Sequence, residues 1–150
     1  MLTIHADLSP ALEQLENMGT RAGKTIRKAA FEGTDLIYWT AVAFAPISKK
    51  PHWFYGSTGQ RYLFEPGSLI DSLYIKHIEE VSEKGVREVY QVLWRKRSSE
   101  LGYVPYAHMV EYGTVRTPPA PFVRPAYDMV KTQAESLIID IIMKAINQNG

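Results

Sequence analysis

The sequence contains no cysteine among its 150 residues and no long apolar run. Without thiols the chain can form no disulfide, no thiolate metal site and no cysteine nucleophile. No stretch reaches the roughly 18 consecutive apolar residues that a membrane span needs. Asp7 and Glu13 stand where a signal peptide would have its apolar region. We therefore expect a soluble protein assembled in the cytosol, with no membrane partner.

An excess of charge of either sign is also lacking. The 17 lysines and arginines nearly balance the 16 acidic residues, which leaves a formal net charge of +1. This balance gives no electrostatic reason to expect a nucleic-acid or membrane partner. The length suits one domain with one core, and residues 1–150 show no internal repeat or low-complexity tract. A single domain is predicted.

Two helices are predicted in the first third of the chain. A Ser-Pro pair at 9–10 starts the first helix, which Gly19 is expected to end. Thr20 caps the second, which Pro46 stops. This second helix has small and apolar residues at helical spacing, namely Ala22, Ile26, Ala29, Gly33, Ile37, Thr40 and Phe44. A glycine inside a helix costs about 1 kcal/mol relative to alanine, so we expect another element to approach closely at Gly33.

Segment 47–66 carries five aromatic residues on both sides of a glycine-rich turn at 56–59, a pattern that predicts a β-hairpin. The five residues are Trp53, Phe54, Tyr55, Tyr62 and Phe64. A two-stranded hairpin is marginal in water, so these side chains either pack on the domain or are held for a partner. Packing is the commoner use of aromatic side chains. In the second case Trp53 and Tyr55 are the expected anchors.

The middle of the chain predicts a pair of antiparallel strands. Alternating residues over 73–81 indicate one strand, 82–85 the turn, and 86–94 the returning strand. A helix is the alternative interpretation of 69–81. The predicted fold class is α+β, with N-terminal helices, a central antiparallel β-sheet with a long aromatic hairpin loop, and a long C-terminal helix.

Prolines and a glycine constrain the last third. Pro105 is expected at the first position of a short helix over 106–112, and Gly113 is expected to end it in the left-handed conformation at positive φ. The prolines between 118 and 125 predict an extended segment, and Pro125 then takes the first position of the final helix. That helix has an unusually wide apolar face, made by Ala126, Val130, Ala134, Leu137, Ile138, Ile139, Ile141, Ile142 and Ala145.

The sequence shows no constellation of catalytic or metal-binding residues. The four histidines are scattered, and none forms the i, i+4 pair of a zinc-binding helix. His108 and Glu111 are an i, i+3 pair, which is two ligands short of a metal site. The glycines at 56–59 lack the lysine of a phosphate-binding loop, and 71–72 has neither a base nor a nucleophile elbow. No enzyme activity, metal or cofactor is predicted.

Two short stretches mix cations with aromatic residues, as nucleic-acid-binding surfaces do. They are 49–53 and 94–97. Against this, glutamates crowd the hairpin that contains the second stretch, and a solvated strand end is the ordinary explanation. No specific nucleic-acid binding is expected.

Three short motifs in the last third follow one another closely. They are Tyr-Ala at 106–107, Val-Glu-Tyr-Gly-Thr at 110–114 and Pro-Phe-Val-Arg-Pro-Ala at 121–126. In this order they resemble the signature of the tail-component family of long-tailed bacteriophages, whose members are interpreted as tail-completion or head-to-tail joining proteins. A weaker similarity extends upstream, to the Ala-Pro at 45–46 and the Gly-Ser-Leu at 67–69. In the family only a few residues separate the Ala-Pro from the Gly-x-Leu motif, whereas in this chain segment 47–66 lies between them.

The resemblance implies a structural virion protein that oligomerises, as a ring, at the head-proximal end of the tail after assembly in the host cytoplasm. The implied partners are further copies of the chain, the tail tube or tail terminator, and the neck (head-completion) proteins. The implied interaction residues are Ala107, Val110, Glu111, Gly113, Thr114, Pro121, Phe122, Arg124 and Pro125. Glu111 is expected to contact a partner, so that Glu111→Gln would leave folding intact and change assembly. The hairpin, with Trp53, Phe54, Tyr55, Tyr62 and Phe64, is the candidate docking loop.

Two other classes of function stay open. One is a small nucleic-acid-binding or adaptor module, and the other is a small enzyme. The size of the protein in solution, together with a salt titration of DNA binding, separates the structural subunit from the binding module.

Overall fold

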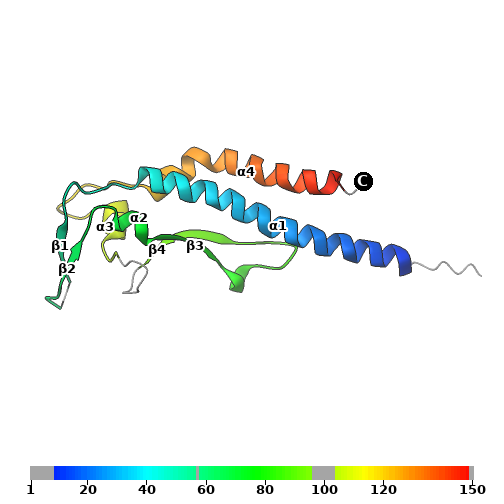
Figure 1. The fold of residues 1–150 in the computed structure, drawn as a ribbon, viewed down its shortest axis with the longest axis horizontal. Coiled ribbons are helices and arrows are strands. Elements are labelled where there is room, and N and C mark those ends of the chain that lie inside the picture. The colour runs from blue at the N-terminus through cyan, green and yellow to red at the C-terminus, as the bar shows by residue number, and fades with distance from the viewer. Residues whose placement is uncertain (1–8, 57, 96–103, 149–150) are drawn as a thin grey trace, which may run out of the picture.

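One long helix organises the fold. In the computed structural model, which describes residues 9–56, 58–95 and 104–148, α1 (Ser9–Phe44) is 36 residues long. The second long helix, α4 (Val123–Asn147), packs along α1, and this is the largest contact between two elements. Figure 1 shows an elongated molecule in which α4 lies on one side of α1 and a pair of strands on the other.

The predicted break at Gly19 is wrong, because α1 continues through Gly19 and Thr20 and ends at Phe44, shortly before Pro46. The glycines in this part of α1 allow another segment to pack closely against the helix. A Cβ on Gly23 would lie 3.2 Å from the Cα of Gly85, and the carbonyl oxygen of Gly19 is nearby, so the strand-connecting turn touches the bare backbone of α1. The side chain of Ala22, which we expected on a helix face, lies outside the described part of the structure.

The expected close approach at Gly33 is confirmed. A Cβ there would lie 2.6 Å from Cδ1 and 2.8 Å from Cγ1 of Ile138 on α4. The two helices meet through small side chains, since Ala29 on α1 and Ala126 and Ala134 on α4 are buried. The absence of large side chains at these positions lets the two backbones pack closely.

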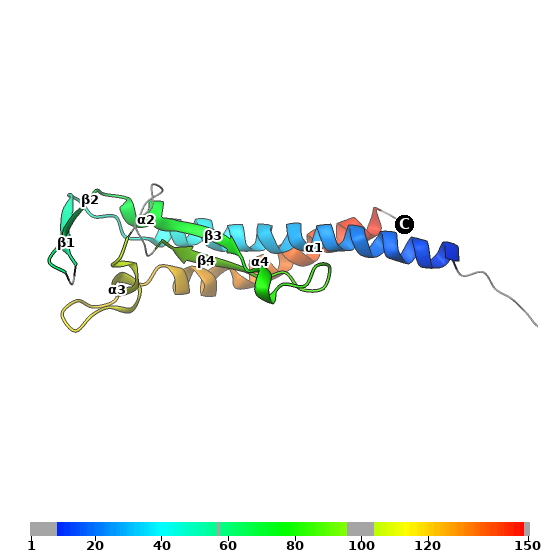
Figure 2. The same cartoon turned by 90° about the horizontal axis from the view of Figure 1, so that it is seen from below.

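The predicted antiparallel pair is confirmed, with shorter strands. It consists of β3 (Leu73–His77) and β4 (Tyr90–Trp94), with Ile75 opposite Val92. The strand and the helix interpretations of 69–81 are each partly correct. A helical turn, α2 (Ser68–Ser72), precedes β3, and a 3-10 turn, η1 (Glu79–Val81), follows it. Figure 2 shows β3 and β4 side by side in front of α1, with α4 beyond β4.

The predicted aromatic hairpin is confirmed as β1 (His52–Tyr55) paired antiparallel with β2 (Arg61–Phe64). Gly59 adopts a φ of 77° in the connection. The hairpin stands at the end of the molecule remote from the start of α1 (Figure 1). Successive residues of each strand alternate between more exposed and more buried positions, as expected of strands with one covered face.

The short helix in the last third is α3 (Ala107–Tyr112), and it is followed by a non-helical segment up to Phe122, as predicted. Two details differ from the prediction. Pro105 precedes the N-cap residue Tyr106, so it lies just outside the helix. Pro125 is the third residue of α4, still within the first turn, where no intrahelical hydrogen bond is lost.

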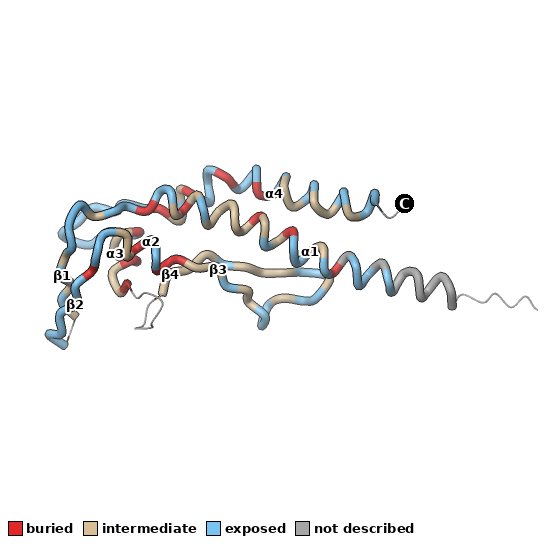
Figure 3. Tube along the Cα trace, viewed as in Figure 1, coloured by how far each residue is buried: buried red, intermediate tan, exposed pale blue. Residues whose placement is uncertain are grey.

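The main cluster of buried apolar residues lies where the end of α1, the aromatic hairpin, α3 and the start of α4 meet. Its buried members are Ala45, Phe64, Leu69, Leu73, Val104, Ala107 and Phe122. Figure 3 shows the buried positions at this end and along the contact between α1 and α4. None of the described helices combines the length and the apolar character that a membrane span requires.

Candidate interaction site

Glu111 holds the start of α4 in place. Its side chain is only 1% exposed, and its two oxygens accept three backbone N–H groups. Oε2 accepts those of Phe122 at 2.8 Å and Val123 at 3.0 Å, and Oε1 accepts that of Arg124 at 2.9 Å. The first N–H groups of a helix have no intrahelical partner, and they attract negative charge. The carboxylate of Glu111 therefore caps α4 from another helix.

The pKa of the Glu111 carboxyl reflects this environment. Burial raises the pKa, but the hydrogen bonds from Phe122, Arg124 and Val123 and from the Arg124 side chain outweigh burial and lower it overall. The surrounding hydrogen bonds therefore stabilise the ionised form of the Glu111 carboxyl over the protonated form. Glu111 is buried and both of its carboxylate oxygens accept hydrogen bonds from its own chain, so we now expect Glu111→Gln to destabilise the fold.

Arg124 closes the same junction from the outside. Its Nε donates to Oε1 of Glu111 at 3.3 Å, and one terminal nitrogen donates to the backbone oxygen of Glu111 at 3.3 Å. The guanidinium also lies over the ring of Tyr112, 4.9 Å from the centroid. The Arg124 side chain remains 60% exposed, so one face of its guanidinium stays available to solvent or a partner.

Gly113 ends α3 at the predicted positive φ, but not in the left-handed helical conformation. Its φ of 75° and ψ of 178° fall in a region that glycine alone adopts readily. A Cβ would also lie 2.8 Å from the nitrogen of Pro119. The proline segment folds back here, since the N–H of Ala120 donates to the oxygen of Val110 at 2.8 Å. The motif glycine thus allows the chain to return along α3.

The nine motif residues come together in this junction. Ala107, Glu111 and Phe122 are buried, and Val110, Gly113 and Pro125 are half-buried. Thr114, Pro121 and Arg124 are exposed. The motif therefore builds the connection between α3 and α4, and only its exposed members lie at the surface of the chain.

Tyr106, the first residue of the first motif but not one of the implied interaction residues, joins this junction to the aromatic hairpin. Its ring lies 5.1 Å from that of His52, 5.8 Å from that of Phe54 and 5.0 Å from that of Phe64. Burial raises the pKa of Tyr106 to about 12. The position of Tyr106 at the head of the first motif was the available signal, but its contacts depend on the tertiary structure.

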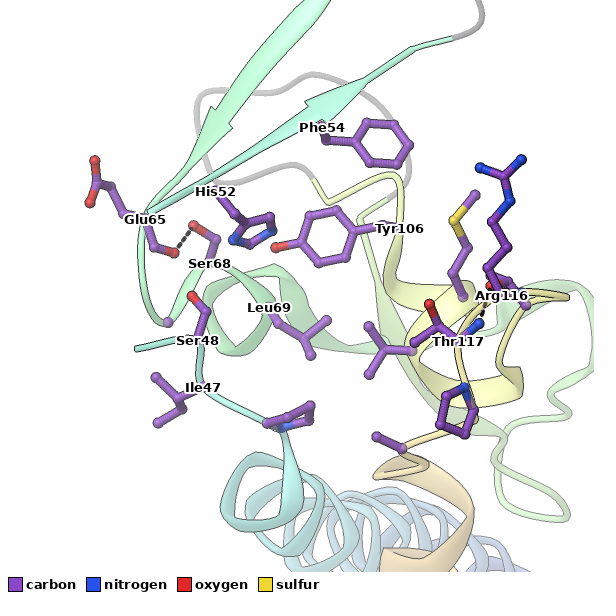
Figure 4. A pocket seen from close by; sticks show the side chains of 17 residues that line it. Ile47, Ser48, His52, Phe54, Glu65, Ser68, Leu69, Tyr106, Arg116 and Thr117 are labelled. Atoms are coloured by element: carbon purple, nitrogen blue, oxygen red, sulfur yellow. Dashed lines mark hydrogen bonds between the residues drawn. The ribbon is translucent and has the colours of Figure 1, made fainter. Parts of the chain in front are cut away.

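An open pocket of about 670 Å³ lies between the hairpin, α2 and α3. Figure 4 shows His52, Phe54 and Tyr106 on one side and Arg116 and Thr117 on another, with Leu69 at the base. The lining is mainly apolar, and Nδ1 of His52 is buried without a partner among the described atoms. This chemistry suits an apolar side chain or segment better than a charged ligand.

The five aromatic residues of the hairpin divide between its two faces. Phe64 is buried, and Phe54 and Tyr62 pack against the core cluster. Trp53 and Tyr55 are 54% and 64% exposed. Arg61 lies over the Trp53 ring at 5.5 Å. Packing on the domain is therefore confirmed for one face, and contact of the other face with a partner stays a prediction.

The cation and aromatic stretches do not form one surface within the described residues. Lys96 and Arg97 lie outside them. Arg95 lies over the ring of Tyr74 at 4.9 Å, and Nε1 of Trp94 is buried without a described partner. Lys49 and Lys50 are exposed at the base of the hairpin.

His108 and Glu111 do not form a metal site, because both oxygens of Glu111 accept backbone N–H groups and His108 is exposed. The described residues contain no group of three or more side chains that could hold a metal ion. A part-buried pair that the sequence did not suggest is His77 and Glu88, whose Nε2 and Oε2 lie 2.6 Å apart. Arg27 on α1 approaches Nδ1 of the same histidine at 3.4 Å, which ties α1 to the strands.

Comparison of the chain with family models, curated proteins and solved structures found no match.

Proposed function

We propose that this chain is a non-enzymatic structural subunit of a bacteriophage tail, acting in tail completion or head-to-tail joining. In this proposal copies of the chain form a ring at the head-proximal end of the tail. One side of the ring contacts the tail tube or tail terminator, and the other contacts the neck (head-completion) proteins. The subunit takes no cofactor and binds no specific nucleic acid.

The observation that carries the proposal is the convergence of the three motifs on which the resemblance rests. Glu111 of the second motif accepts the backbone N–H groups of Phe122, Val123 and Arg124 of the third. Tyr106 of the first motif packs on the hairpin beside them. The contact between the second and third motifs supports the interpretation that they act together.

A second apolar stripe on α4 supports self-association. Ile139, Met143 and Ile146 are 59%, 49% and 57% exposed. Their spacing of four and three residues places them on one face of the helix. By the same geometry this face is roughly opposite to the one that packs on α1 through Val130 and Ala134. An exposed apolar stripe of this kind is typical of a surface that packs against another helix.

Removal of the chain from the phage that encodes it tests the proposal. With a stop codon early in the gene, we expect infected cells to produce filled heads and complete tails that do not join. Adding the purified chain to such a lysate should restore joined particles. Joined virions in the absence of the chain would contradict the proposal. A salt titration of DNA binding serves as a check on the alternative, because a nucleic-acid-binding module would show affinity that falls steeply with salt.

A further inference from the structure

The outer edge of β4 is an unpaired strand edge. The N–H of Ile78 donates to the oxygen of Val89, and the N–H of Arg95 donates to the oxygen of Ser72, at 2.8 and 3.0 Å. Hydrogen-bonded and non-hydrogen-bonded pairs alternate along an antiparallel ladder. The backbone groups of Gln91 and Leu93 therefore face β3. Those of Tyr90, Val92 and Trp94 point away from it, and no described strand lies on that side.

A groove runs along this edge. It has a volume of about 560 Å³ and is lined by consecutive residues 90–93 of β4, by Ile37 of α1, and by Val123 and Tyr127 of α4. Figure 1 shows α1 between the pair of strands and α4, so the groove is bounded by all three elements. The groove therefore offers backbone hydrogen-bonding groups along one wall and a mixture of apolar and polar side chains on the others, because Thr34, Arg124 and Asp128 also line it. That combination fits an added β-strand.

The aromatic hairpin has a matching free edge. The N–H of Gly56 donates to the oxygen of Gln60 at 2.9 Å, and the register pairs Phe54 with Tyr62. By the same alternation the backbone groups of Trp53 and Tyr55 point away from β2. The side chains of these two residues are also the exposed aromatic ones of β1. A hairpin of two short strands is stabilised when its edge pairs with another sheet.

The charges at the groove do not oppose a basic segment. Segment 49–65 carries Lys49, Lys50 and Arg61 against Glu65. At the groove, Nε of Arg124 lies 3.3 Å from Oε1 of Glu111, and Oδ1 of Asp128 lies 3.5 Å from Nζ of Lys131. Both charges are paired within the chain, so the choice of occupant rests on the matching strand edges.

We propose that β1 of one copy adds as a strand to the outer edge of β4 in the next copy, with Trp53 and Tyr55 packing into the groove. The contact is head-to-tail, because the two surfaces differ, and a head-to-tail contact repeats into a ring when its rotation closes. This inference rests on the self-association in the proposed function and names the surfaces that carry it.

Two variants, each defective on one surface, test the pairing. Val92→Pro removes an N–H that points away from β3, so the ladder with β3 keeps its bonds and the edge can no longer accept a strand. Its control is Val92→Thr, which keeps the N–H. Trp53→Ser/Tyr55→Ser removes both anchors from exposed positions, and its control is Trp39→Ser, an exposed tryptophan on α1. Circular dichroism and thermal unfolding verify that each variant folds.

Sedimentation velocity over a range of concentrations gives the result. We expect the wild type and both controls to self-associate, and each defective variant to do so about tenfold more weakly or worse. A 1:1 mixture of the two defective variants should form dimers, because the intact hairpin of one meets the intact β4 edge of the other. If Val92→Pro does not fold, the double serine variant alone tests the pairing. Loss of association in that variant but not in Trp39→Ser would support the pairing, and association in both would refute it.

Failure of this inference is distinguishable from failure of the proposed function. If the wild type forms oligomers and the defective variants do so equally well, the pairing of β1 with β4 is wrong and the ring subunit stands. The same conclusion follows if the mixture forms no dimers. If the wild type stays monomeric at every concentration, both are overturned.

Discussion

Oε1 of Glu111 accepts two hydrogen bonds from Arg124, one from its backbone N–H at 2.9 Å and one from its Nε at 3.3 Å. Arg124 therefore interacts with this oxygen in two ways. Its backbone N–H belongs to the first turn of α4, and its guanidinium is the counter-ion of the carboxylate. The contact joins α3 to α4 across the proline segment.

Replacement of Glu111 by glutamine is expected to destabilise the fold. Glutamine offers one acceptor oxygen in place of two, so at least one buried backbone N–H loses its partner, at a cost of about 1–3 kcal/mol. Urea denaturation of the variant should show this loss. Glu135→Gln, at an exposed position of α4, is the control and should leave the free energy of unfolding unchanged within about 0.5 kcal/mol. Equal stability of both variants would refute the capping role.

The contribution of Glu111 should depend on pH. Because its pKa is lowered in the folded state, its stabilisation is fully present above the unfolded pKa of about 4.3 and is lost as pH falls through the folded value. The difference in unfolding free energy between wild type and Glu111→Gln should therefore be constant above about pH 5.5 and shrink below about pH 4. Taking the difference removes the effect of other carboxylates. A difference that stays constant down to pH 2.5 would show that the charge of Glu111 is not involved.

Gly113→Ala is expected to destabilise the chain for two separable reasons. The backbone conformation costs a residue with a side chain about 1–3 kcal/mol, and the new Cβ would also overlap Pro119. Gly59→Ala is the control, since Gly59 has a φ of 77° but open space around the Cβ position. We expect thermal unfolding to show a larger loss at 113 than at 59. Equal losses would mean that contact with Pro119 adds nothing.

Because α1 and α4 approach closely at Gly33, we predict that the effect of Gly33→Ala on stability changes sign when Ile138 is replaced by alanine. In the wild-type background Gly33→Ala brings a Cβ to 2.6 Å from Ile138 and should destabilise. In an Ile138→Ala background the obstructing atoms are absent, and the same change should stabilise by up to about 1 kcal/mol through helix propensity. A double-mutant cycle by chemical denaturation measures the coupling. Additive effects would show that the two side chains do not meet.

The two faces of the hairpin should respond differently to truncation. Phe64→Ala removes a buried ring from the core cluster and should cost about 3–5 kcal/mol. Trp53→Ala removes a half-exposed ring and should cost about 1 kcal/mol or less. Equilibrium unfolding of both variants measures the contrast. A large loss from Trp53→Ala would place Trp53 in the fold of the single chain and remove it as a free anchor.

The parts of the fold that were predicted from the sequence depend on residues close together in the chain. Gly113, the prolines from 118 to 125 and the alternation in β1 and β2 each limit their own backbone, so those elements were located correctly. The continuity of α1 was missed because Gly19 reads as a stop signal locally, whereas in the structure the turn at Gly85 packs beside it. That contact joins residues far apart in the chain.

The candidate site was predictable as a list of residues but not as an arrangement. The motif identified Glu111, but its partners lie 11 to 13 positions away and are backbone groups, which carry no sequence signal. The pair of His77 and Glu88 depends on the register of β3 and β4. The groove beside β4 depends on how α4 lies against α1, and no local pattern specifies that.

The central claim is that copies of this chain assemble into a closed ring, and electron microscopy of the purified protein tests it most directly. Negative-stain images at protein concentrations at which sedimentation shows oligomers should contain closed rings of one size. Rings should be lost in the Val92→Pro variant and kept in Val92→Thr. Images that show only single chains or two-fold dimers under these conditions would contradict the account.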